Sequence, residues 1–174
     1  YRLPEEILIS LNNFAEKFIP EASQHPVPQQ YQTEAFIPKM VWQNTKNYNS
    51  AEKVIETAVD WLMFKKKCHP SDIIILTPNH KEGMQLVRTF NRKSNRNRIY
   101  SVNHVFSDNP RWDKRNKKSF WMGDGRLKMS TIHSFKGWEL LNIVLLTPEG
   151  DGKYEGNIDS LMYTAMSRTL QNLV

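Results

Sequence analysis

The feature that most constrains this fold is an unbroken apolar run, Ile73 to Leu76, set between Asp72 and Thr77. A short run of branched aliphatic residues bounded by turn residues is typical of a strand buried on both faces of a parallel sheet. Residues 127–132 and 142–146 have the same apolar and β-branched character. The chain therefore predicts a sheet whose central strands are covered on both faces.

Segments with helical periodicity alternate with these strands. Pro4 suits a first helical position, Ser50 is a candidate N-cap, and Asn79 with Glu82 forms a candidate capping pair. Strands that alternate with helices indicate a parallel α/β sheet with right-handed crossovers. The expected helices cover residues 4–19, 50–67, 80–93 and 159–170, and the expected strands lie within 31–45, at 72–77, 99–102, 127–132 and 142–146, and from 172 onward.

Composition narrows the class of protein. The 174 residues are 39% hydrophobic, which is enough for one globular domain with a real core. Lys and Arg exceed Asp and Glu by 24 to 18, and this basic balance weakly favours a polyanionic partner. One cysteine excludes an internal disulfide. No apolar run approaches the length of a membrane span and no signal peptide is visible, so we expect a cytoplasmic protein without a membrane partner.

A polar turn lies between the strands expected at 127–132 and 142–146. It carries hydroxyl, imidazole and ammonium donors, one glycine and one carboxylate: Ser130, Thr131, His133, Ser134, Lys136, Gly137 and Glu139. Ligands of open α/β sheets bind at strand-end loops, so we expect this loop at an edge of the sheet. The mixture suits phosphate, ribose or nucleic-acid contacts better than core packing.

Three sequence motifs resemble one family. S-T-I-H-S-F-K-G-W-E, residues 130–139, resembles motif V of the UvrD/Rep-like superfamily 1 DNA helicases. Residues 161–174 resemble motif VI, and residues 1–8 resemble the end of motif IV. The middle of the chain, about 24–126, matches only in its α/β pattern. The resemblance implies one domain over 1–174, a RecA-like, P-loop-NTPase-type three-layer α/β/α parallel sheet that lacks its own phosphate-binding loop.

The resemblance also implies a nucleotide site. Arg168 and Arg2 would contact the γ-phosphate of ATP as catalytic arginines, Tyr1 would stack on adenine, and Glu139 would accept a ribose hydroxyl. Gly137 would let the backbone approach the ligand. A planar, permanently charged guanidinium suits the charge that develops during phosphoryl transfer. The alternatives are an ordinary solvated arginine, a frayed terminus, a surface glutamate and a plain turn glycine.

Three residues would bind single-stranded DNA by the same resemblance, namely Thr131, His133 and Lys136. Hydroxyl and imidazole groups donate to phosphate oxygens, and lysine neutralises charge. His133 could instead be a structural histidine. We expect no metal site, because neither His133 nor the adjacent Cys68 and His69 has companions at ligand spacing.

Residues 103–125 have no clear periodicity and are expected to form a loop, where larger relatives insert an accessory domain. Basic and aromatic residues alternate there, and Arg111 with Trp112 are the candidates for nucleic-acid binding. The alternative is a solvated loop whose tryptophans anchor it to the core.

The chain contains neither a G-x-x-x-x-G-K-[ST] loop nor an acidic strand-end pair. Together with this absence, the resemblance implies an excised second motor domain of an ATP-dependent DNA helicase, with DNA repair as the implied setting. Alone it would be inactive, since ATP and Mg²⁺ would be held mainly by an N-terminal RecA-like domain. The alternatives are part of an RNA helicase or of a helicase-nuclease fusion, a non-catalytic nucleic-acid-binding module with a degenerate helicase fold, and an interaction domain.

Overall fold

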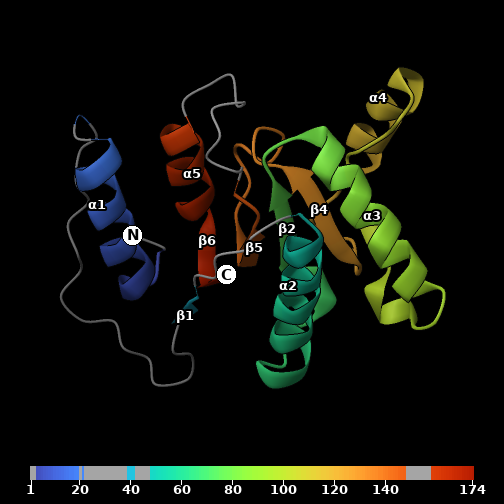
Figure 1. Cartoon of the computed structure of the whole chain (residues 1–174), viewed down its shortest axis with the longest axis horizontal. Coiled ribbons are helices and arrows are strands. Elements are labelled where there is room, and N and C mark those ends of the chain that lie inside the picture. Colours follow the sequence, from blue (N-terminus) through green and yellow to red (C-terminus); the bar gives the residue numbers. More distant parts are fainter. Residues whose placement is uncertain (1–2, 20, 22–38, 42–47, 148–157) are drawn as a thin grey trace.

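The computed structural model describes residues 3–19, 21, 39–41, 48–147 and 158–174, which form one six-stranded sheet (Figure 1). Every paired strand runs parallel to its neighbour, in the spatial order β1-β6-β5-β2-β4-β3. The predicted parallel sheet is thus confirmed. The strands are β1 (Lys39–Met40), β2 (Ile73–Thr77), β3 (Val102–His104), β4 (Leu127–Thr131), β5 (Leu140–Leu145) and β6 (Thr169–Leu173).

Helices cover both faces of the central strand β2. Ile73 and Ile75 pack into one core cluster with residues of α2 and α3, and Ile74 and Leu76 pack into another with residues of α1 and α5. Side chains alternate between faces along a strand, so a strand covered on both sides is apolar at every position. The predicted three-layer RecA-like α/β arrangement is confirmed. The helices are α1 (Glu5–Phe18), α2 (Tyr48–Asp60), α3 (His80–Ser94) and α5 (Ile158–Met166).

The helix boundaries agree with the prediction at α3 and differ at α2. The side chain of Asn79 accepts a hydrogen bond from the amide of Glu82 (3.0 Å), as the capping pattern predicts. Ser50 lies inside α2, which has already begun at Tyr48, so Ser50 is not its N-cap. The helix then widens into a π-helical turn over Trp61–Lys65. None of the described helices is long and apolar enough to cross a membrane.

The segment predicted as a loop at 103–125 contains a helix, α4 (Pro110–Ser119). The prediction was wrong because α4 is strongly polar and presents no apolar stripe from which to recognise a helix. The start signal was nevertheless present, since Asn109 precedes a proline at the first helical position. The carbonyl of Asn109 accepts the amide of Trp112 (3.0 Å) and so closes the first turn.

Three other predicted boundaries move because pairing in the sheet overrides local pattern. The helix predicted to reach residue 170 ends at Met166, and the strand predicted from 172 begins at Thr169, which pairs with Leu140. The strand predicted at 99–102 begins only at Val102. A β-branched threonine suits a ladder better than a helix end.

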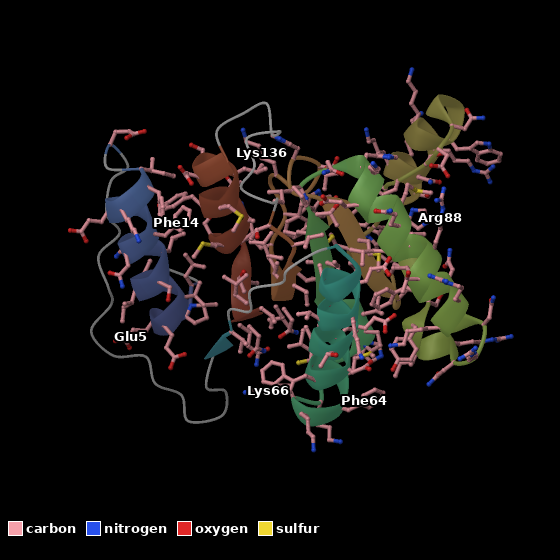
Figure 2. All side chains as sticks on the ribbon, viewed as in Figure 1. Glu5, Phe14, Phe64, Lys66, Arg88 and Lys136 are labelled. Carbon is pink, nitrogen blue, oxygen red and sulfur yellow. The ribbon has the colours of Figure 1, made fainter. Side chains whose placement is uncertain are left out.

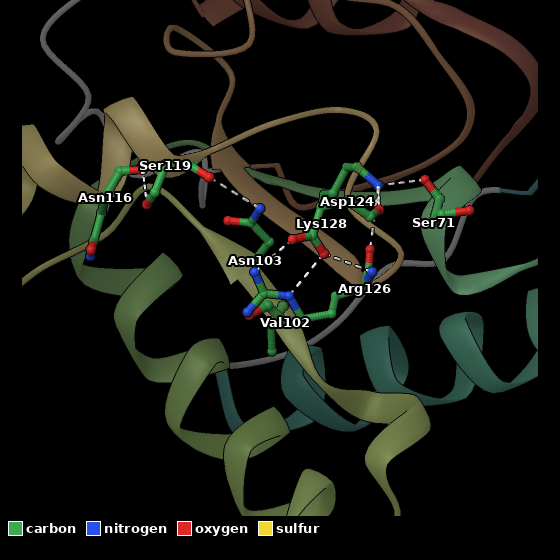
Figure 3. Close-up of polar contacts among 8 residues, drawn as sticks. All are labelled: Ser71, Val102, Asn103, Asn116, Ser119, Asp124, Arg126 and Lys128. Atoms are coloured by element: carbon green, nitrogen blue, oxygen red, sulfur yellow. Dashed lines mark hydrogen bonds and ion pairs between the residues drawn. The ribbon is translucent and has the colours of Figure 1, made fainter.

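A buried lysine, Lys128, attaches residues 124–126 to strand β4 (Figure 3). Leu127 and Met129 belong to the α2/α3 cluster, so Lys128 between them points to the opposite face, where it is fully buried. Its Nζ donates to the carbonyls of Ser71 (2.6 Å), Asp124 (2.9 Å) and Arg126 (3.3 Å). These bonds tie residues 124–126 to β4 and to the loop before β2. Burial lowers the pKa of Lys128, against the attraction of Asp124 and Asp72.

Asp124 makes the same segment sensitive to acid. The Arg126 side chain donates to both Asp124 oxygens (2.8 and 2.6 Å), and this pairing lowers the pKa of Asp124 from 3.8 to about 2. A carboxylate with a depressed folded pKa stabilises the fold above its unfolded value and loses that contribution as pH falls. We expect Asp124→Asn to be less stable than the wild type at pH 6, with the difference shrinking between about pH 4 and 2. Urea unfolding across this range measures it.

The matched control is Asp108→Asn, which removes the same charge from an exposed ion pair with Arg88 (2.8 Å; Asp108 side chain 66% exposed). A difference for Asp124→Asn that stays constant down to pH 2 would contradict the pairing.

Candidate nucleotide and nucleic-acid interface

The segment 132–139 joins opposite edges of the sheet. β4 ends at Thr131, level with Thr77 at the end of β2, whereas β5 begins at Leu140, level with Thr169 at the start of β6. Since the strands are parallel, the first pair lies at the carboxyl edge and the second at the amino edge. The expectation that the whole loop lies at one edge is therefore wrong.

Two apolar side chains fix this crossover. Ile132 and Phe135 are each 1% exposed and pack into the α1/α5 cluster. The amide of Phe135 donates to the Thr131 carbonyl (3.1 Å), which closes one helical turn. With the apolar residues turned inward, His133 and Lys136 are exposed. The crossover is thus an anchored segment with a polar outer face.

Gly137 adopts a backbone conformation that favours glycine. Its φ is 94°, and a Cβ built on it would meet nothing within 4 Å. Conformation rather than lack of space therefore accounts for the residue, as in the plain-turn alternative. Close approach of this backbone to a ligand stays a prediction.

The amino edge brings together two of the predicted nucleotide residues. The amide of Leu140 donates to the Arg168 carbonyl (3.2 Å), so Glu139 and Arg168 adjoin paired backbone positions. Both side chains are half-buried. The Nε of Arg168 is buried and finds no acceptor within the part of the chain that the structure describes. A buried guanidinium N–H of this kind suits an anionic oxygen. Tyr1 and Arg2 lie outside the described residues.

The carboxyl edge carries the residues predicted to bind DNA. The Thr131 hydroxyl donates to the Ser134 hydroxyl (3.0 Å) and accepts the Ser134 amide (3.1 Å). This hydroxyl therefore caps the turn, and a contact between Thr131 and DNA stays a prediction. Figure 2 places Lys136 near the top of the molecule, the side on which α3 begins and α4 projects.

The basic and aromatic residues of 103–125 lie largely on and beyond α4, which contains Arg111 and Trp112. The Trp112 side chain is 51% exposed, and the Arg115 guanidinium lies 4.9 Å from its ring centroid. Trp121 is 64% exposed, whereas Phe120 packs against both core clusters. The alternative in which the tryptophans anchor this segment is therefore wrong, because Phe120 is the anchor.

Sequence reasoning missed the buried polar groups of the sheet. Besides Lys128, the side chain of Asn172 donates to Asn142 Oδ1 (2.6 Å), and Asn142 Nδ2 donates to the Asp72 carbonyl (3.0 Å). Each amide links neighbouring strands or the loop before β2 inside the core. The signal in the sequence is one polar residue that interrupts an apolar strand, and it does not identify the partners.

Comparison with solved structures shows structural likeness. No family model and no curated protein matches the chain. A crystal structure of the Pyrococcus furiosus Hef helicase domain is similar over 70% of this chain, with a TM-score of 0.41 and 16% sequence identity. The match spans 24% of the length of that structure.

Proposed function

We propose that this chain is the second RecA-like motor domain of an ATP-dependent superfamily 1 DNA helicase. The three sequence motifs, in the family's order, and the parallel three-layer fold support the proposal. An N-terminal RecA-like domain of the same protein would hold most of ATP and its Mg²⁺. This domain would close over the nucleotide from the other side and would hold one DNA strand.

The observation that carries the proposal is the hydrogen bond from the Leu140 amide to the Arg168 carbonyl at the amino edge. It brings Glu139 and Arg168 to the starts of neighbouring strands, and among the described residues the buried Nε of Arg168 has no acceptor. Arg168 would stabilise charge on the γ-phosphate, and Glu139 would accept from the ribose. Three further residues would complete this nucleotide site. Tyr1 would stack on adenine, Arg2 would add a second guanidinium, and Gly137 would let the backbone come close to the nucleotide.

The DNA contacts would lie at the other edge. Lys136 and His133 are exposed on the crossover, where they can meet phosphate oxygens, and Thr131 begins the same segment. One continuous stretch would therefore touch DNA near its start and nucleotide at its end. Movement of the domain upon hydrolysis would then change the contacts with the strand.

Two variants test the assignment of the edges in a protein that joins this chain to its N-terminal motor domain. We expect Glu139→Gln to raise the KM for ATP about 10-fold or more, because a charged hydrogen bond to ribose is weakened. We expect Lys136→Gln to weaken binding of an oligothymidine and to reduce its logarithmic salt slope by about 0.7, the value for one phosphate contact.

Steady-state ATPase assays and fluorescence anisotropy give the two constants for each variant. The reverse pattern, with Glu139→Gln acting on oligonucleotide affinity and Lys136→Gln on the KM for ATP, would overturn the assignment. An oligouridine titrated in parallel compares DNA with RNA.

A further inference from the structure

Helix α4 carries a concentration of positive charge. Its ten residues contain five basic side chains and one acidic one, Asp113. Lys114, Arg115 and Lys118 are exposed, and none pairs with a carboxylate within the described part of the chain. Some cations elsewhere on the surface are paired, for example Lys93 with Glu56 (3.6 Å) and Arg126 with Asp124 (2.6 Å). Lys114, Arg115 and Lys118 can therefore bind a polyanion outside the chain.

The helix is held by Asn116, on a face turned away from these cations. The side chain of Asn116 donates to the Phe106 carbonyl (2.5 Å), and Phe106 is fully buried. A Cβ on Gly83 of α3 would lie 2.3 Å from the Phe106 ring, so the ring occupies the space that this glycine leaves open. At 100° per residue, positions 114 and 118 lie nearly opposite Asn116, and position 115 lies about 100° to one side. The anchor thus fixes the direction in which the basic face points.

Two aromatic rings accompany the basic face. The ring of Trp112 is half exposed and has the Arg115 guanidinium beside it. The ring of Trp121 lies against Gly123, where a Cβ would be 2.4 Å from it, and it is 64% exposed. Sites for single-stranded nucleic acid combine cations placed along the phosphate backbone of the nucleic acid with exposed aromatic rings that stack on its bases.

The place of α4 in the fold suits a continuous path. The helix follows β3, and His104 at the end of β3 is level with Met129 near the end of β4. The start of α4 is therefore on the carboxyl-edge side, where the crossover begins at Thr131. A single-stranded nucleic acid that leaves this edge of the sheet can continue along α4, which is about 15 Å long.

We propose that α4 and Trp121 form a second contact with single-stranded nucleic acid, separate from the crossover. The cations Lys114, Arg115 and Lys118 bind phosphates, and Trp121 stacks on a base. This contact rests on the proposed function and deepens it: the domain holds more of the strand than the three motifs account for.

The test uses the 174-residue chain and a labelled oligothymidine of about 20 nucleotides, titrated by fluorescence anisotropy over a range of salt. The triple variant Lys114→Gln, Arg115→Gln, Lys118→Gln is expected to reduce the logarithmic salt slope by about 2 and the affinity about 10- to 100-fold near 0.1 M salt. The control variant Lys53→Gln, Lys65→Gln, Arg98→Gln removes the same charge from exposed positions elsewhere and should keep the wild-type slope.

Trp121→Ala separates stacking from charge. We expect it to weaken binding of the single strand about 5- to 100-fold with the salt slope unchanged, and to leave duplex binding alone because a duplex hides its base faces. A triple variant with the wild-type slope, a control that loses as much, or a wild-type chain that does not bind would overturn the α4 contact. An unaffected Trp121→Ala would overturn the stacking role. The nucleotide role is decided independently, by the ATPase of Arg168 variants.

Discussion

If the proposed function holds, replacing Arg168 by alanine should reduce DNA-stimulated ATP turnover about 10³-fold or more in a protein that joins this chain to the proposed N-terminal RecA-like domain. An arginine that stabilises the transferring phosphoryl group contributes about 10³ to 10⁵ to turnover. Within the described residues its Nε has no partner, so the loss should not be an effect of unfolding. Arg168→Lys should recover little activity, because an ammonium lacks the planar, multiple donors of a guanidinium.

The ATPase rate measures the effect, and a fluorescent ATP analogue checks that nucleotide binding is retained. Arg98→Ala is the control, since that arginine is exposed on a different part of the fold. Hydrolysis at the wild-type rate in Arg168→Ala would remove the phosphate role. A parent protein without any hydrolysis would favour a non-catalytic nucleic-acid-binding module instead.

The second large effect concerns stability. Lys128→Met should lower the free energy of unfolding by about 2–4 kcal/mol. The substitution keeps the volume but leaves the carbonyls of Ser71, Asp124 and Arg126 without their shared donor. An unsatisfied buried acceptor costs about 1–3 kcal/mol, and the relief of ammonium desolvation offsets part of the sum.

Urea unfolding of the chain measures the change, with the exposed Lys53→Met as control. Hydrogen exchange should locate the damage in residues 120–126, which lose their tie to β4 before the rest of the sheet opens. A variant as stable as the wild type would mean that the three carbonyls find other partners.

The sheet could be predicted because β2 is covered on both faces. Burial on both faces requires an apolar residue at every position from Ile73 to Leu76. This pattern can be recognised in the sequence without knowing which strands and helices pack against β2. Helix α3 was equally readable, since its cap at Asn79 and its apolar stripe are both local. Local signals of this kind carried most of the fold.

The remaining features depend on contacts between distant residues. The start of β6 at Thr169 is decided by Leu140 on another strand, and the position of Lys128 is decided by carbonyls from two loops. Helix α4 has no apolar stripe because it is held by one amide and by Phe120 beyond its end. For the site, the motif resemblance identified the candidate residues. It did not show that Lys136 and Arg168 belong to different parts of the sheet, which follows only from the register of the parallel strands.

The crossover between β4 and β5 has a mechanical consequence. Nine residue steps lead from Thr131 to Leu140, enough for at most about 30 Å of chain. By the sheet register its ends lie six residue positions apart along the strands, about 20 Å, and a helical turn consumes part of the difference. With Ile132 and Phe135 fastened to the core, the segment has little slack. A displacement of the segment at the carboxyl edge of the sheet should therefore be transmitted to the amino edge instead of being absorbed by the segment.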